Sequence, residues 1–120
     1  MKKPKATNPE LTELSRFLRK QSTENNVKIW KTIAALLTKT KRNRVAVNLS
    51  RLNRNTQKNE VAVVPGKVLS AGELDHPITI TAFAFSQKSR EKILAANGKC
   101  LSFADLIKKN PKGSNVKIIR

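Results

Sequence analysis

The chain has 120 residues and a mass of 13.4 kDa, which is the length of one domain with a single hydrophobic core. It carries 25 Lys and Arg against 8 Asp and Glu, so its net charge is +17 and its pI is about 10.8. Like charges at this density repel one another in a compact fold, and contacts with phosphates relieve the repulsion while releasing counterions. The surplus is far larger than an ordinary enzyme carries, and it predicts a nucleic acid partner.

Other classes of protein fit the sequence poorly. A hydrophobic content of 38% with clear periodicity argues against a fully disordered chain. The single cysteine, Cys100, cannot form an intrachain disulfide, which fits a reducing compartment. No apolar run approaches the roughly 20 residues that cross a bilayer, and the lysine-rich start lacks the apolar stretch of a secretory signal. We therefore expect a soluble, cytoplasmic protein with no membrane partner.

The amino-terminal residues predict a basic arm followed by a helix. Residues 1–7 lack apolar periodicity, so we expect a flexible arm that orders only against its partner. The basic residues of the arm are Lys2, Lys3 and Lys5. Asn8 is a favourable helix cap and Pro9 suits the first helical position, so a helix should run from there to about Gln21. Its apolar stripe consists of Leu11, Leu14, Phe17 and Leu18.

A second helix is expected from about Val27 to Leu37, because apolar residues again recur on one face. Trp30 lies on that face, so we predict that it is a core residue; the alternative is a platform on which bases stack. The other residues of the stripe are Ile33, Ala34 and Leu37.

The densest run of positive charge follows, over residues 39–58, and no acidic residue interrupts it. Its seven basic residues are Lys39, Lys41, Arg42, Arg44, Arg51, Arg54 and Lys58. Within the run, Val45–Leu49 has the composition of a short strand, and Ser50 could cap a brief helix. That helix would present Arg51 and Arg54 on one face, three residues apart.

The charge is unevenly distributed along the chain, which distinguishes a binding surface from a merely solvated face. Residues 1–58 hold a surplus of 12 positive charges, against 5 in residues 59–120. Arginine should contribute most, because its planar fork can grip a phosphate at two points or stack on an unpaired base. With only four Phe and one Trp, the chain has no evident platform for single-stranded bases. The sequence therefore predicts recognition of phosphates and of folded RNA shape.

The middle of the sequence predicts two strands. Val61–Val64 is an apolar, mostly β-branched run typical of an internal strand, and Pro65-Gly66 is expected to end it in a turn. Residues 67–74 continue from that turn, with Gly72 at a tight bend. A second strand is expected over Ile78–Phe85.

The remaining residues predict two capped helices and a final strand. Ser86 should cap a helix over Lys88–Ala96, which Asn97-Gly98 would end in the left-handed conformation. After it come a helix capped by Ser102 over Phe103–Lys109, a turn at 110–113 and a strand over Val116–Ile119.

This alternation of strands and helices predicts an α/β domain behind a helical amino-terminal segment. We divide the chain into a flexible basic arm (1–7) and a single domain (8–120), the latter with a helical part (8–38), a basic RNA-facing run (39–58) and an α/β part (59–120).

Residues that carry chemistry are scarce, with one His, one Cys, two Asp and no Tyr. The lone histidine, His76, lies between Asp75 and Pro77, where a role in a turn is favoured over proton transfer. No cluster with metal-ligand spacing is present in the sequence, so we expect no metal, no cofactor and no small-molecule substrate. Val64-Pro65-Gly66-Lys67 lacks the second glycine and the Lys-Ser/Thr pair of a nucleotide loop. Lys67 is therefore either a contact to an RNA phosphate or a plain solvated lysine.

Several motifs, taken together, resemble a known family. They are Asn8-Pro9, Val47-Asn48-Leu49-Ser50-Arg51, Val64-Pro65-Gly66-Lys67-Val68-Leu69 with Gly72, Phe85-Ser86, and Asn110-Pro111-Lys112-Gly113-Ser114-Asn115-Val116. In this order and spacing they resemble the archaeal and eukaryotic large-subunit ribosomal protein eighteen family, which is related to bacterial large-subunit protein fifteen. The compact length is similar to that of archaeal members. The resemblance implies an irregular superhelical α/β fold and a structural, non-catalytic place on large-subunit ribosomal RNA, beside other ribosomal proteins.

Two segments match the characteristic stretches of the family, 47–51 and 67–72, and the resemblance therefore adds weight to Arg51 and Lys67 as RNA contacts. It leaves Asn48 a structural role. The turn holds Ser70 and Ala71 where related chains often have glycine. The full set of candidate RNA contacts is Lys2, Lys3, Lys5, Lys39, Lys41, Arg42, Asn43, Arg44, Arg51, Arg54, Lys58 and Lys67.

Two other classes remain as alternatives. A DNA-binding, chromatin-type protein would share the small size and the charge, but it would bind duplex DNA without preferring folded RNA. An enzyme that cuts or modifies RNA would need a carboxylate cluster, a metal site or a cofactor loop, and the activity of such an enzyme should depend on His76.

Overall fold

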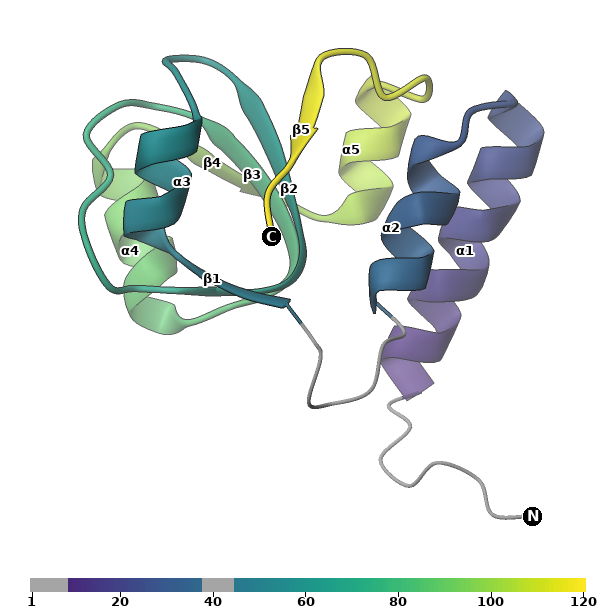
Figure 1. Cartoon of the computed structure of the whole chain (residues 1–120), viewed down its shortest axis with the longest axis horizontal. Coiled ribbons are helices and arrows are strands. Elements are labelled where there is room, and N and C mark those ends of the chain that lie inside the picture. The colour runs from purple at the N-terminus through teal and green to yellow at the C-terminus, as the bar shows by residue number, and fades with distance from the viewer. Residues whose placement is uncertain (1–8, 38–44) are drawn as a thin grey trace.

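The computed structural model of the chain describes residues 9–37 and 45–120, and within these ranges two helices are followed by a mixture of helices and strands (Figure 1). The predicted α/β class is confirmed. The elements are α1 (Pro9–Asn25), α2 (Ile29–Leu37), β1 (Val45–Asn48), α3 (Leu49–Asn55), β2 (Val61–Leu69), β3 (Thr79–Phe85), α4 (Gln87–Ala95), β4 (Lys99–Leu101), α5 (Phe103–Lys109) and β5 (Val116–Ile118). No helix of the described ranges is long and apolar enough to cross a membrane.

The strands form one parallel sheet in which β2 has three partners. Strand β3 runs beside one edge of β2 and carries β4 on its own outer edge. The other edge of β2 is shared, because β5 pairs with Val61–Val63 and β1 pairs with Gly66–Leu69. Strand β2 is therefore the element that joins the two halves of the sheet.

The predicted turn at Pro65-Gly66 is wrong, since β2 continues through both residues to Leu69. Proline is tolerated in this strand because Pro65 pairs with no residue of β1, β3 or β5. It lies where the shared edge passes from β5 to β1, and where the register with β3 shifts between Val64 and Lys67. Proline lacks a backbone N–H group, and at this position no neighbouring strand of the described residues would accept a hydrogen bond from one. The strand bends at this irregularity (Figure 1).

Helices cover both faces of the sheet, α3 and α4 on one side and α5 with the α1–α2 pair on the other (Figure 1). Side chains of β2 alternate between the two cores: Val64 and Val68 lie in the α3–α4 core, and Val63 lies in the opposite one. Burial on both faces explains why this strand reads as a continuous apolar run. The prediction of an internal strand at Val61–Val64 is confirmed.

The capping predictions for the last two helices are confirmed. The Ser86 hydroxyl oxygen accepts a hydrogen bond from the Ser89 N–H (3.2 Å), and the Ser102 hydroxyl oxygen accepts one from the Asp105 N–H (3.1 Å). Asn97 ends α4 at a φ of 65°, in the left-handed region.

Two features of the fold were not predicted. Helix α1 extends beyond Gln21 to Asn25. In this polar stretch the Asn25 amide donates to the Gln21 carbonyl (3.0 Å) and the Thr23 hydroxyl donates to the Arg19 carbonyl (3.2 Å). Strand β4 is only three residues long and too short for a periodic signal.

Trp30 is a core residue, as predicted, and its side chain is fully buried. Its indole N–H donates to the carbonyl of Pro111 (2.8 Å), which ties α2 to the turn that precedes β5. Gly113 fits closely in this turn, since an added Cβ would lie 2.6 Å from Cγ2 of Ile29. This hydrogen bond adds to the core packing of the helix pair against α5 in joining it to the carboxyl-terminal part of the chain.

Replacing Trp30 tests how much its hydrogen bond to Pro111 and its packing stabilise the fold. Trp30→Phe keeps an aromatic ring but removes the donor and part of the volume, so the free energy of unfolding should fall by about 1–3 kcal/mol. Urea unfolding followed by circular dichroism measures the change. Leu94→Ala, at a side chain that is 56% exposed, should change it little and serves as the control. Equal effects of the two substitutions would contradict the role of Trp30.

Candidate nucleic-acid interface

The structure describes four of the twelve candidate RNA contacts: Arg51, Arg54, Lys58 and Lys67. The others lie outside the described residues: Lys2, Lys3, Lys5, Lys39, Lys41, Arg42, Asn43 and Arg44.

Helix α3 presents two arginines to solvent, as its sequence predicts. Leu49 and Leu52 are fully buried against the sheet. Arg51 and Arg54 are both exposed, three residues apart on the surface of the same helix. Burial of the two leucines therefore decides which way the arginines point.

The start of α3 differs from the prediction that Ser50 caps it. The helix begins at Leu49, and Asn48 occupies the cap position without a capping bond from its side chain. The Asn48 side-chain oxygen instead accepts from the N–H of Ala71 (3.2 Å), and the Ser50 N–H donates to the Ala71 carbonyl (3.0 Å). Backbone groups of the turn after β2 thus partner the first turn of α3, and Asn48 has the structural role suggested for it.

Gly72 lets this turn approach the helix, and the predicted tight bend is confirmed. Its φ is +90°, and an added Cβ would lie 2.5 Å from the Cβ of Ser50 and 2.9 Å from its backbone nitrogen. Ser70 and Ala71 do not have positive φ values. Only Gly72 in this turn therefore requires the freedom of glycine.

Lys92 of α4 holds the same turn from the other side. Its ammonium group donates to the carbonyl oxygens of Ser70 (3.0 Å) and Gly72 (2.9 Å), and it lies 3.3 Å from the Glu73 carboxylate. The sequence contains no local signal for these contacts, which span about twenty residues. The two segments on which the resemblance rests, 47–51 and 67–72, therefore bind each other and are braced by α4.

Lys67 does not join the arginines of α3. Val68 points into the core beneath α3 and α4, so the neighbouring Lys67 projects from the opposite face of the sheet, where it is exposed beside Ala46. Lys58 lies in the turn after α3. The structure brings Arg51 and Arg54 together and leaves Lys67 on the other face.

These four basic residues have no acidic partner in the part of the chain that the structure describes. Its four ion pairs lie elsewhere: Lys20–Glu24, His76–Asp75, Lys92–Glu73 and Lys117–Glu60. The positive charges on α3 are thus not neutralised by the described residues, which suits them for phosphate oxygens.

Helix α4 adds basic residues that the sequence reasoning missed. Lys88 is exposed in its first turn, just after the end of β3. The guanidinium of Arg90 lies 5.0 Å from the centre of the Phe85 ring, a favourable cation–π arrangement. Both residues follow the cap at Ser86, and a basic first turn after a strand is the signal that could have identified them.

His76 has partners on both ring nitrogens. Nε2 lies 2.9 Å from the Thr56 hydroxyl, which donates to the Leu52 carbonyl, and Nδ1 lies 2.9 Å from the Asp75 carboxylate. The bond to His76 and a second one to Asn53 lower the pKa of Asp75 below its usual value. These bonds attach the loop before β3 to the end of α3. In the described ranges no group of three or more His, Cys, Asp or Glu could hold a metal.

Glu60 secures the turn that carries Lys58. Its carboxylate accepts from the backbone N–H of Gln57 (2.6 Å) and from the ammonium of Lys117 on β5 (3.1 Å). The bond from Gln57, followed by that from Lys117, lowers the pKa of Glu60 below its usual 4.5. The charged form is therefore favoured in the folded protein.

This contact predicts a dependence of stability on pH. A carboxylate with a lowered folded pKa stabilises the fold above its unfolded pKa and loses that effect as the pH falls through the folded value. Glu60→Gln should therefore lower the Tm at neutral pH, and the difference from wild type should vanish as the pH falls below about 4.5. Thermal melts of both proteins between pH 7 and 3 measure this difference in Tm. A constant difference would contradict the prediction, and Glu91→Gln on the exposed face of α4 is the control.

Gly72→Ala tests the close approach between the turn and α3. The added methyl group meets backbone atoms of Ser50 and a strained φ, so the fold should lose about 1–3 kcal/mol. Urea unfolding gives the value. Ala71→Gly changes the preceding residue, which is exposed, and should have a much smaller effect. A stable Gly72→Ala protein would show that the turn can move away from α3 without cost.

Comparisons with known proteins agree with the resemblance. The model of the family described as "Ribosomal protein 60S L18 and 50S L18e" matches residues 1–120. Large ribosomal subunit protein eL18 of Methanothermobacter thermautotrophicus is 46% identical over 113 residues, which cover 94% of this chain and 93% of that protein.

Proteins of the same name from two further archaea are similar over nearly their full lengths. The one from Methanoregula boonei is 48% identical, covering 95% of this chain and 94% of that protein. The one from Methanococcus maripaludis is 44% identical, covering 99% of each. The chain therefore belongs to the 60S L18 and 50S L18e family of ribosomal proteins and is a structural protein of the large ribosomal subunit.

Proposed function

We propose that the chain binds folded large-subunit ribosomal RNA mainly through its basic run at residues 39–58, and that it supports translation in the cytoplasm as a non-catalytic component. The observation that carries this proposal is the arginine pair of α3. Arg51 and Arg54 are exposed and lack acidic partners among the described residues. The helix that bears them is held by the turn after β2 and by the loop before β3.

Rigid support matters because folded RNA presents phosphates at fixed positions. An arginine on a braced helix loses less conformational freedom on binding than one on a loose segment. Stacking on unpaired bases is less favoured beside α3, because Trp30 and Phe103 are buried and Phe85 is already covered by Arg90. The half-buried Phe17 and Phe83 lie on the other side of the sheet. Recognition by phosphate contacts and shape follows from this arrangement.

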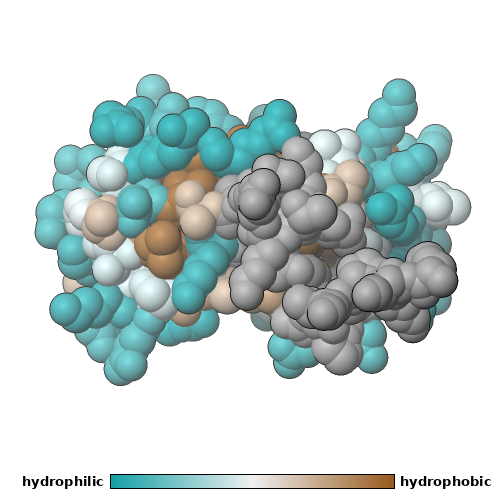
Figure 2. Space-filling view, turned by 60° about the horizontal axis from the view of Figure 1, so that its bottom comes forward, coloured by the Kyte–Doolittle hydropathy of each residue, from teal (hydrophilic) through white to brown (hydrophobic). Residues whose placement is uncertain are grey.

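Lys67 extends the proposed contact to the opposite face of the sheet. It is exposed near the carboxyl end of β2, while α3 starts at the carboxyl end of β1, its neighbour. Figure 2 views the molecule from the side on which β1 lies in Figure 1, and hydrophilic side chains border an apolar patch on its left there. We propose that RNA contacts this end of the sheet from both faces.

Substituting the two arginines tests the proposal. Arg51→Ser with Arg54→Ser should weaken binding to large-subunit RNA and reduce the slope of log K against log salt by about 1 for each arginine. Filter binding at several salt concentrations measures both. Adding Arg42→Ser and Arg44→Ser should enlarge the effect.

The control is Arg16→Ser with Arg19→Ser, an equally spaced and exposed pair on α1. This control should lower RNA affinity less than the α3 double substitution does. Equal losses of affinity would show that binding depends only on the total charge. Competition with duplex DNA separates the DNA-binding alternative, which predicts that DNA displaces the RNA equally well.

A further inference from the structure

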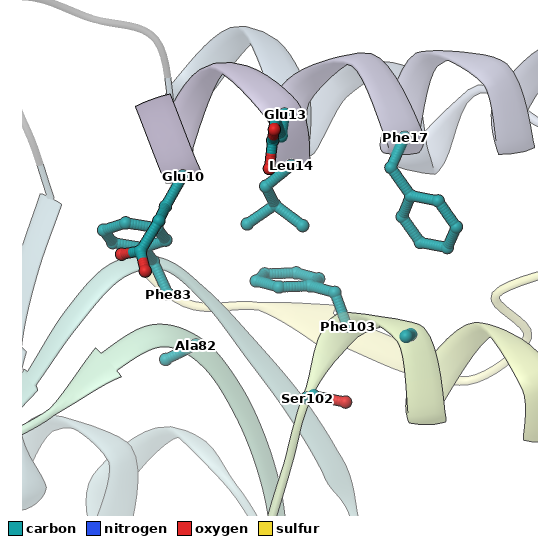
Figure 3. A pocket seen from close by; sticks show the side chains of 9 residues that line it. Glu10, Glu13, Leu14, Phe17, Ala82, Phe83, Ser102 and Phe103 are labelled. Atoms are coloured by element: carbon teal, nitrogen blue, oxygen red, sulfur yellow. The ribbon is translucent and has the colours of Figure 1, made fainter. Parts of the chain in front are cut away.

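A hollow of about 490 Å³ lies between α1 and the elements beneath it, on the side of the sheet away from α3 (Figure 3). Figure 3 shows Leu14 and Phe17 of α1 pointing down, with Phe103 of α5 below Leu14 and Phe83 of β3 beside Glu10. Leu14, Phe17 and Phe83 are only half-buried. The hollow therefore offers apolar surface that the described residues do not cover.

A second hollow of about 430 Å³ continues the first along α1 and α5. Phe17 and Ala104 line both, and the second reaches Ile107 and Pro111. We call the two together the acidic groove, for the charge at its first end.

The first hollow of the acidic groove differs in charge from most of the protein. Glu10 and Glu13 line it, and none of its described lining residues is Lys or Arg, although the chain has a net charge of +17; Lys108 lines the second hollow. Carboxylates repel phosphates, so this surface disfavours RNA. Its apolar floor and acidic rim are complementary to a polypeptide that carries both apolar and basic side chains.

The neighbouring sheet edge indicates the shape of such a polypeptide. Strand β4 pairs with β3 only over Thr79–Thr81, so no strand of the described residues lies beside the outer edge of Ala82–Phe85. Ala82 and Phe83 line the groove. An extended segment placed there could hydrogen bond to the open edge of β3 while its side chains reach the groove.

We propose that the acidic groove binds an extended segment of another large-subunit protein, in which Lys or Arg alternates with apolar residues. The apolar side chains pack on Leu14, Phe17 and Phe83, and a basic side chain pairs with the exposed Glu13 at the rim of the first hollow. This surface is separate from the arginines of α3, so the proposal does not depend on the mode of RNA binding.

Site-specific crosslinking in intact large subunits identifies the occupant. A photoreactive phenylalanine analogue at position 104, which is exposed and lines both hollows, should crosslink to a protein, and mass spectrometry should locate the crosslink in a segment with alternating basic and apolar residues. The same analogue at position 94, on α4, should not give that product. Crosslinks from position 104 to RNA, to this chain itself or to an acidic segment, or no crosslink at all, would overturn the proposal.

Charge reversal at the rim tests how the segment is held. Glu13→Lys should reduce the yield of the position-104 crosslink about fivefold, and Glu13→Gln should reduce it less. Glu91→Lys makes the same change in net charge on the exposed face of α4 and should leave the yield unchanged. Thermal melts of the three proteins check that each is folded. Equal yields with Glu13→Lys and Glu91→Lys would refute pairing at the rim even if RNA binding through α3 holds.

Discussion

Strand β2 hydrogen bonds to β3 along one edge and to both β5 and β1 along the other, and the rest of the structure depends on this shared edge. A regular strand could not change partners halfway without leaving backbone groups unpaired. Pro65 lies where the change occurs, and it has no N–H group to leave unpaired. The second half of the strand then delivers the turn that docks on α3 and places its arginines.

The fold places its basic surface on α3 and its acidic groove on opposite sides of the sheet. The basic surface on α3 is braced by the bond from Ala71 to Asn48 and by the close fit of Gly72, and Lys92 holds the same turn from α4. Among the described residues no acidic side chain forms an ion pair with Arg51 or Arg54, and Glu60 neutralises Lys117 on β5. Glu10 and Glu13 instead line an apolar groove on the far side of the sheet. Under the two proposals made above, a single small domain presents different chemistry to RNA and to protein.

Local patterns predicted much of the fold, and contacts distant in sequence account for most of what they missed. Ser86 and Ser102 cap helices because the capping bond is made within three residues, so sequence alone indicates it. The prediction ended a strand at Pro65, because proline is normally excluded from the middle of a sheet. The strand continues because the edge of β2 changes partner there, and that change depends on β5, about fifty residues later. The face on which Lys67 lies follows from a strand that continues past Pro65, where the prediction ended it, and the bracing by Lys92 depends on how α4 packs. Exposure of Arg51 and Arg54 could be predicted, since the buried leucines beside them set it.

The bond between Trp30 and Pro111 has a consequence for how the chain is made. These partners are 81 residues apart, and β5, which completes the shared edge of β2, is synthesised later still. While the chain emerges from the ribosome, the edge of β2 at Val61–Val63 and the apolar surface of α1 and α2 that faces α5 and β5 therefore lack their partners until almost the whole sequence has been made. During this interval the unfinished protein exposes apolar surface as well as its high positive charge, which favours aggregation and premature association with RNA.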